Sequence, residues 1–208
     1  MIIQEGINTL VQLAVVLVVC GLVWLVFGRK GVGFRQYLGL YAPPLGGWIA
    51  ALIIFMVWGA ITTTLYMIPE LTEAVTADNT VAGGLRAFGF SGQTMVLILI
   101  IAVFKTALTE EIFFRGLIAK RLIHHAGFRV GNTLQALLFG SVHLLIFVIP
   151  GGPEFTPMLG LAFLCLPGAA GWLMGFANER YGAGSIAPGW LIHALGNATS
   201  YPIMAFLL

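Results

Sequence analysis

Charged residues are scarce in this chain, and their scarcity excludes an ordinary soluble domain. Of the 208 residues, 9% are charged and 59% are hydrophobic, whereas a soluble globular domain carries about 25% charged residues. The composition therefore predicts an all-α, polytopic bundle of transmembrane helices, in contact with the lipid bilayer and without a soluble domain. The net charge of +2 is too small to suggest nucleic acid as a partner.

Cysteine is also rare, because only Cys20 and Cys165 occur in the whole chain. Both lie inside apolar stretches without a CxxC spacing, which indicates neither a disulfide framework nor a thiolate metal site. The first eight residues contain Glu5 but no Lys or Arg, unlike the basic start of a signal peptide. We therefore expect the first apolar stretch to be retained as a membrane span.

Long apolar stretches predict six membrane helices, since about 20 residues cross a hydrocarbon core of ~30 Å. The predicted spans are residues 9–27, 48–68, 93–124, 133–149, 158–178 and 186–208. The third is too long for one perpendicular crossing, so we expect it to be tilted, broken near Lys105 and Thr106, or extended into the cytoplasm. Pro, Gly and Asn predict loops at residues 41–47, 76–84 and 150–157.

The charges of the loops predict the orientation, because Lys and Arg favour the cytoplasmic side of a membrane. One set of loops carries the basic residues Arg29, Lys30, Arg35, Lys120, Arg121, Arg129 and Arg180. The opposite loops carry Glu70, Glu73, Asp78 and Glu154, with Arg86 as their one basic residue. We therefore expect a multi-pass protein of the cell membrane with both termini outside.

Two adjacent carboxylates, Glu110 and Glu111, interrupt the apolar segment IAVFKTALTEEIFFRGL at residues 101–117. An ionised side chain costs roughly 2.5 to 3.5 kcal/mol at the centre of a membrane helix, so both need partners, water or a function. Glu111 and Arg115 are four residues apart on one helical face, which predicts an ion pair. Glu110 points about 100° away and is free to meet another helix.

Further polar residues lie on later apolar segments. His193 and Asn197 have i, i+4 spacing and share one helical face, and Phe139 shares a face with His143 for the same reason. Counted from the predicted cytoplasmic ends of their spans, Glu110, His143 and His193 lie at depths of roughly 10 to 17 Å. If the three helices are neighbours, these residues line a polar pocket that opens toward the cytoplasm.

Three short sequences stand in order on apolar segments: EEIFFRG beginning at Glu110, FGSVH ending at His143, and HALGN running from His193 to Asn197. Together they resemble the signatures of the CPBP intramembrane proteases, which include type II CAAX prenyl proteases and bacterial Abi-type proteins linked to bacteriocin processing or self-immunity. The resemblance covers about residues 104–197. It implies a catalytic membrane core at residues 93–208, preceded by membrane helices without signatures at residues 1–92.

The resemblance also implies a glutamic-type endopeptidase that needs no metal and hydrolyses a peptide bond of a membrane-associated substrate. In this family the first glutamate activates water, a role that falls here to Glu110 assisted by His143, while His193 and Asn197 would stabilise the oxyanion. A carboxylate paired with a cation is the weaker base, which agrees with this choice of glutamate. Orientation or substrate contact would fall to Glu111, Arg115 and Phe139.

Other interpretations of these residues stay open. Two histidines and a glutamate form a ligand set that zinc accepts, so a zinc-dependent intramembrane protease is the nearest alternative, although no HExxH is present. Intramembrane Glu, His and Arg also form proton relays, which would suit a proton-coupled transporter, but the two halves of the chain show no inverted repeat. A non-catalytic immunity scaffold is a further alternative. Neither the substrate nor the oligomeric state follows from the sequence.

Overall fold

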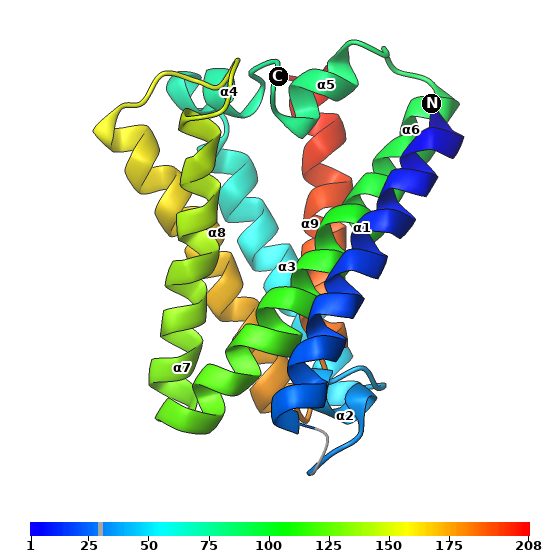
Figure 1. The fold of residues 1–208 in the computed structure, drawn as a ribbon. Coiled ribbons are helices and arrows are strands. Elements are labelled where there is room, and N and C mark those ends of the chain that lie inside the picture. The colour runs from blue at the N-terminus through cyan, green and yellow to red at the C-terminus, as the bar shows by residue number, and fades with distance from the viewer. Residues whose placement is uncertain (29–30) are drawn as a thin grey trace.

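The computed structural model of the protein describes residues 1–28 and 31–208. Within these residues all regular secondary structure is helical, which confirms the all-α prediction, and the long helices form one bundle (Figure 1). Three helices are long and apolar enough to cross a membrane, namely Ile2–Gly28, Leu45–Leu65 and Pro157–Tyr181. The count of six spans stays a prediction.

The part of the chain before the glutamate-bearing segment contributes two long helices, α1 (Ile2–Val23) and α3 (Leu45–Leu65). A π-helical turn, Trp24–Gly28, extends α1. The short helices are α2 (Phe34–Leu38), α4 (Pro69–Val75) and α5 (Val81–Arg86). The predicted loops at residues 41–47 and 76–84 are therefore wrong from Leu45 and from Val81 onward. Thr80 explains the second error, because its hydroxyl accepts the Gly83 N–H (3.0 Å) and caps α5.

The segment that carries both glutamates is one long helical run. The helix α6 (Gly92–Leu99) continues through two π-helical stretches, η2 (Ile100–Leu108) and η3 (Glu111–Ala119), into α7 (Lys120–His143). Of the three alternatives for this segment, the break near Lys105 and Thr106 does not occur, because the first π-helical stretch runs through both residues. The chain reverses instead at Gly127, whose φ of 75° favours glycine, and the rest of α7 returns along the bundle (Figure 1).

The last two long helices are α8 (Pro157–Phe176), extended by the π-helical turn η5 (Ala177–Tyr181), and α9 (Ala187–Phe206). Glycines bring α7 and α8 into close contact. A Cβ on Gly175 would lie 2.0 Å from Asn132 Oδ1, and one on Gly140 would lie 2.2 Å from the carbonyl oxygen of Leu164. These two helices therefore pack backbone against backbone, as small residues permit in membrane proteins.

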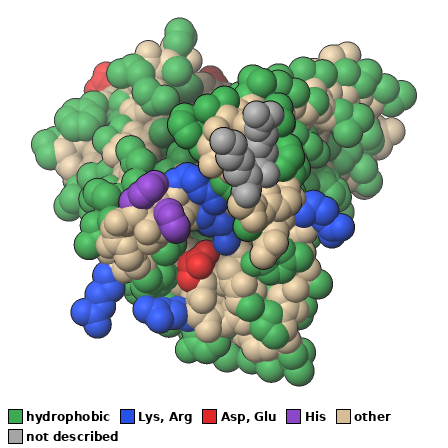
Figure 2. All heavy atoms as spheres, turned by 60° about the horizontal axis from the view of Figure 1, so that its bottom comes forward, with side chains coloured by type: hydrophobic (Ala, Val, Ile, Leu, Met, Phe, Trp, Pro, Cys, Tyr) green, Lys and Arg blue, Asp and Glu red, His purple; other side chains and the backbone are tan. Residues whose placement is uncertain are grey.

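The two ends of the bundle differ in charge. Both termini lie at the end that carries α4 and α5, and the opposite end carries α2 and the bend of α7 (Figure 1). Lys, Arg and His side chains gather on that opposite end (Figure 2), where Arg35 belongs to α2, and Lys120 and Arg121 begin α7. Arg29 and Lys30 lie outside the described residues. The same-side termini and the charge asymmetry agree with the predicted loop arrangement.

Candidate active site

The π-helical stretch before the glutamates is held by side chains from two neighbouring helices. Trp190 of α9 donates its indole N–H to the carbonyl oxygen of Val103 (2.9 Å), and Gln12 of α1 donates to that of Lys105 (2.9 Å). The Thr106 hydroxyl donates to the carbonyl oxygen of Ile101 (2.9 Å). Single π-helical turns recur at functional sites because they change where the following side chains point. Here they lead directly into Glu110 and Glu111.

Glu111 is fully buried and bound on one oxygen by two partners. Its Oε1 lies 2.8 Å from Arg115 Nη1 and 3.2 Å from His193 Nδ1, which confirms the predicted ion pair. Arg115 is buried too, and its guanidinium lies 4.0 Å from the centre of the Phe139 ring. Since an ionised carboxylate can only accept, Nδ1 of His193 carries the hydrogen and donates it to Glu111.

The second oxygen of Glu111 lies against the start of α9. A Cβ on Gly189 would be 2.7 Å from Glu111 Oε2 and 2.8 Å from Asn178 Nδ2, so glycine is needed for this approach. Asn178 Oδ1 accepts the backbone N–H of Gly189 (2.7 Å). The sequence patterns did not indicate Asn178 or Gly189. For Asn178, its position as a polar residue at the end of a long apolar stretch is a signal that could have identified it.

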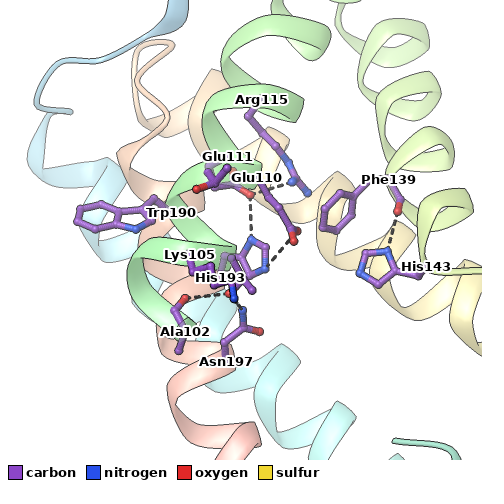
Figure 3. A network of polar contacts seen from close by, with 12 residues as sticks. Ala102, Lys105, Glu110, Glu111, Arg115, Phe139, His143, Trp190, His193 and Asn197 are labelled. Carbon is purple, nitrogen blue, oxygen red and sulfur yellow. Dashed lines mark hydrogen bonds and ion pairs between the residues drawn. The ribbon is translucent and has the colours of Figure 1, made fainter. Parts of the chain in front are cut away.

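Glu110 lies in a more open environment than its neighbour. Its side chain is 32% exposed, and its Oε2 lies 3.8 Å from His193 Nε2, which is longer than a direct hydrogen bond. The carboxylate lies between the His193 ring and the pair formed by Phe139 and His143 (Figure 3). Glu110 thus meets another helix, α9, as expected. The close polar contact of Glu110 is with His193, whereas the sequence led us to expect that His143 would assist Glu110 in activating water.

The remaining predicted residues face the same region. The ring nitrogen Nδ1 of His143 lies 2.7 Å from the carbonyl oxygen of Phe139; a carbonyl only accepts, so Nδ1 carries the hydrogen and Nε2 is left for other partners. The two rings lie 4.9 Å apart between centres. Asn197 donates from Nδ2 to the hydroxyl of Thr106 (2.9 Å), a partner that the sequence had not indicated.

A cavity of about 520 Å³ joins these residues to the end of the bundle that carries the termini. Its walls include Phe139, His143, His193 and Asn197, and it continues between α3, α8 and α9 to α4 and α5. The lining residues thus reach the end of the bundle opposite the Lys- and Arg-rich one, and the prediction that the pocket opens toward the basic end stays a prediction. On the basic side of the site the helices approach closely, because a Cβ on Gly116 would lie 2.9 Å from the Leu38 carbonyl oxygen.

In the part of the chain that the structure describes, no group of three or more His, Cys, Asp or Glu side chains is placed to hold a metal ion. The carboxylate of Glu111 already neutralises the guanidinium of Arg115 at 2.8 Å. The zinc alternative stays a prediction.

These residues fall within the part of the chain that matches a known protein family. A model of the type II CAAX prenyl endopeptidase Rce1-like family matches residues 92–199, which is 108 of the 208 residues. The chain belongs to this Rce1-like family. The match contains all seven residues singled out from the sequence, and it confirms the resemblance to the CPBP proteases. No curated protein and no solved structure matched the chain. Family membership and the apolar helices indicate a membrane protease.

Proposed function

We propose that this protein is an intramembrane endopeptidase in which Glu110 activates the water that attacks a peptide bond. The main support is the contrast between the two adjacent glutamates. Glu111 is held by Arg115 and His193, whereas the partly exposed Glu110 is free to bind water beside His193. A general base needs a carboxylate that can accept a proton, and an oxygen bound by a guanidinium accepts one poorly.

The arrangement of His193 suits a group that acts together with Glu110. Glu111 accepts the Nδ1 hydrogen of His193 and so directs Nε2 toward Glu110. The same logic, in which a carboxylate orients a histidine, recurs in hydrolases of unrelated fold. Water bound near Glu110 attacks the scissile carbonyl carbon while its proton passes to the carboxylate. Glu110 then returns this proton to the leaving amine as the C–N bond breaks.

Two side chains face the position where negative charge would develop. Asn197 uses one amide hydrogen for Thr106 and retains a second hydrogen for the oxyanion. His193 donates to the same oxyanion when its Nε2 also carries a hydrogen. One such donor contributes about 2.7 to 4 kcal/mol to transition-state stabilisation in a protease. His143, anchored through Nδ1 to Phe139, turns Nε2 to the water and assists Glu110.

The substrate we propose is a membrane-associated peptide, because the cavity walls are largely apolar and uncharged apart from the histidines. We further propose that the chain spans the cell membrane several times with its basic end in the cytoplasm. The cavity then runs toward the outer side, where both termini also lie.

The decisive experiment compares membrane proteomes of cells that carry the native protein or Glu110→Gln, with cleaved protein termini as the readout. We expect the cleaved termini that the native protein produces to be absent from cells with Glu110→Gln. The variant should accumulate to the same level as the native protein. A matched control is Glu70→Gln, which changes an exposed glutamate of α4. Cleavage that survives Glu110→Gln removes Glu110 from the mechanism. Cleavage lost on chelation and restored by zinc would favour the metal-dependent alternative.

A further inference from the structure

The connection between α4 and α5 lies at the far end of the cavity and carries an asparagine that also borders a second cavity beside Glu5 and Lys105. Asn79 lines the cavity, and both Oδ1 and Nδ2 of its carboxamide are buried. Neither atom has a hydrogen-bond partner within the described residues. A buried polar group without a partner is destabilising, so it needs an explanation. A ligand that reaches the end of the cavity would provide the missing partner.

We propose that Asn79 is a substrate-binding residue whose carboxamide pairs with a backbone peptide group of the segment to be cleaved. This inference rests on the peptidase function proposed above. A carboxamide carries a donor and an acceptor on one planar group, as a peptide unit does. The carboxamide of Asn79 therefore binds the main chain of the substrate, and the walls of the cavity contact the side chains of the substrate.

The walls of the cavity indicate what kind of segment binds. They include Trp58 of α3, Tyr66 directly after it, and Phe163 of α8. No Asp, Glu, Lys or Arg is among the lining residues that the structure describes, and the histidines are the side chains there that can carry a charge near neutral pH. The volume of about 520 Å³ is in the usual range for sites that enclose a ligand. The occupant is therefore an uncharged, largely apolar peptide segment.

Asn79 is held in place by two short helices that are anchored separately. On one side, Ala82 and Leu85 of α5 pack in the same buried cluster as Met204 of α9, and Arg86 donates to the Met204 carbonyl oxygen (3.1 Å). On the other side, α4 packs through Leu71 and Ala74 against Leu159 of α8. A binding group fixed from both sides loses little freedom when the ligand arrives.

Binding can be measured without cleavage in the Glu110→Gln background. The probe is a fluorescent pentapeptide of Leu and Ala with blocked, uncharged ends, titrated in detergent micelles. We expect Asn79→Ala to weaken binding about tenfold, which corresponds to the loss of a hydrogen-bonded pair. The control is Asp78→Ala, because Asp78 is adjacent and exposed but does not line the cavity. It should bind the probe unchanged.

A second set of probes tests whether Asn79 contacts the peptide backbone. The pentapeptide is N-methylated at one position at a time, which removes one backbone N–H. At one position, methylation should weaken binding to the Asn79 protein about tenfold and leave binding to Asn79→Ala unchanged, as coupled groups in a double-mutant cycle behave. Equal affinity of folded Asn79→Ala and the parent protein, or additive effects at every position, would overturn the inference. Survival of cleavage in Glu110→Gln would instead refute the proposed function, so the two failures are distinguishable.

Discussion

The two adjacent glutamates lie in different surroundings, a buried ion pair and a partly exposed position beside a histidine that lines the cavity. The Glu111 side chain is 0% exposed and that of its partner Arg115 is 1% exposed. Glu110 is 32% exposed and lies beside His193, which lines the cavity. Identical side chains on one helix can therefore have opposite uses. A carboxylate held by a buried cation is a structural group, and one without such a partner is available for chemistry.

The largest effect should come from removing the cation that pairs with the buried Glu111. Arg115→Met leaves the buried Glu111 without its guanidinium, and breaking a buried pair on one side costs about 3 to 5 kcal/mol. Thermal unfolding in detergent, followed by helical circular dichroism, measures the loss. Glu110→Gln is the matched comparison, because the partly exposed carboxylate supports the fold little. Equal destabilisation by both variants would abolish the contrast between the two glutamates.

The next effect separates the two histidines. His193 contacts both glutamates, whereas His143 is anchored to its own helix through Phe139. We expect His193→Ala to lower kcat by about 10²- to 10³-fold, the usual cost of losing one donor to the oxyanion. His143→Ala should reduce kcat less. The measurement is cleavage of a fluorogenic membrane peptide in vesicles, and a larger loss with His143→Ala would return the main assisting role to that residue.

A smaller effect tests the close approach of α9 to Glu111. The added methyl of Gly189→Ala would lie 2.7 Å from Glu111 Oε2, and overpacking of this kind costs about 1 to 3 kcal/mol. Gly196→Ala is the control on the same helix, because nothing lies within 4 Å of its added carbon. That control should be neutral or slightly stabilising in a thermal melt. If the two variants unfold at the same temperature, the contact at Gly189 has no energetic weight.

Local features of the sequence predicted much of the fold and part of the site. Apolar composition indicated the helices, and i, i+4 spacing indicated the pair of Glu111 with Arg115. The features that it did not predict depend on distant partners. Trp190 supports the π-helical stretch from 87 residues away, and Gln12 does so from 93 residues away.

The course of the cavity could not be predicted for the same reason. Depth along a helix can be counted from the sequence, but the space left between helices depends on how they pack. The contact of Gly116 with the backbone of Leu38 has no local signature, and neither has the position of Asn79 at the cavity end. Spacing therefore indicated which polar residues share a helical face, and tertiary packing decides which of them line the cavity.

The smallest effect concerns a second ion pair within the apolar helices. Lys105 Nζ lies 2.5 Å from Glu5 Oε1, but the two side chains are 31% and 16% exposed, unlike the sealed pair of Arg115 and Glu111. Exposed pairs contribute about 0 to 1 kcal/mol, so Lys105→Met should change thermal stability by no more than this and leave cleavage intact. Glu5→Gln should give the same result, because each variant removes the same attraction. A loss of 3 kcal/mol or more with either variant would show that burial does not separate structural from dispensable charges in this bundle.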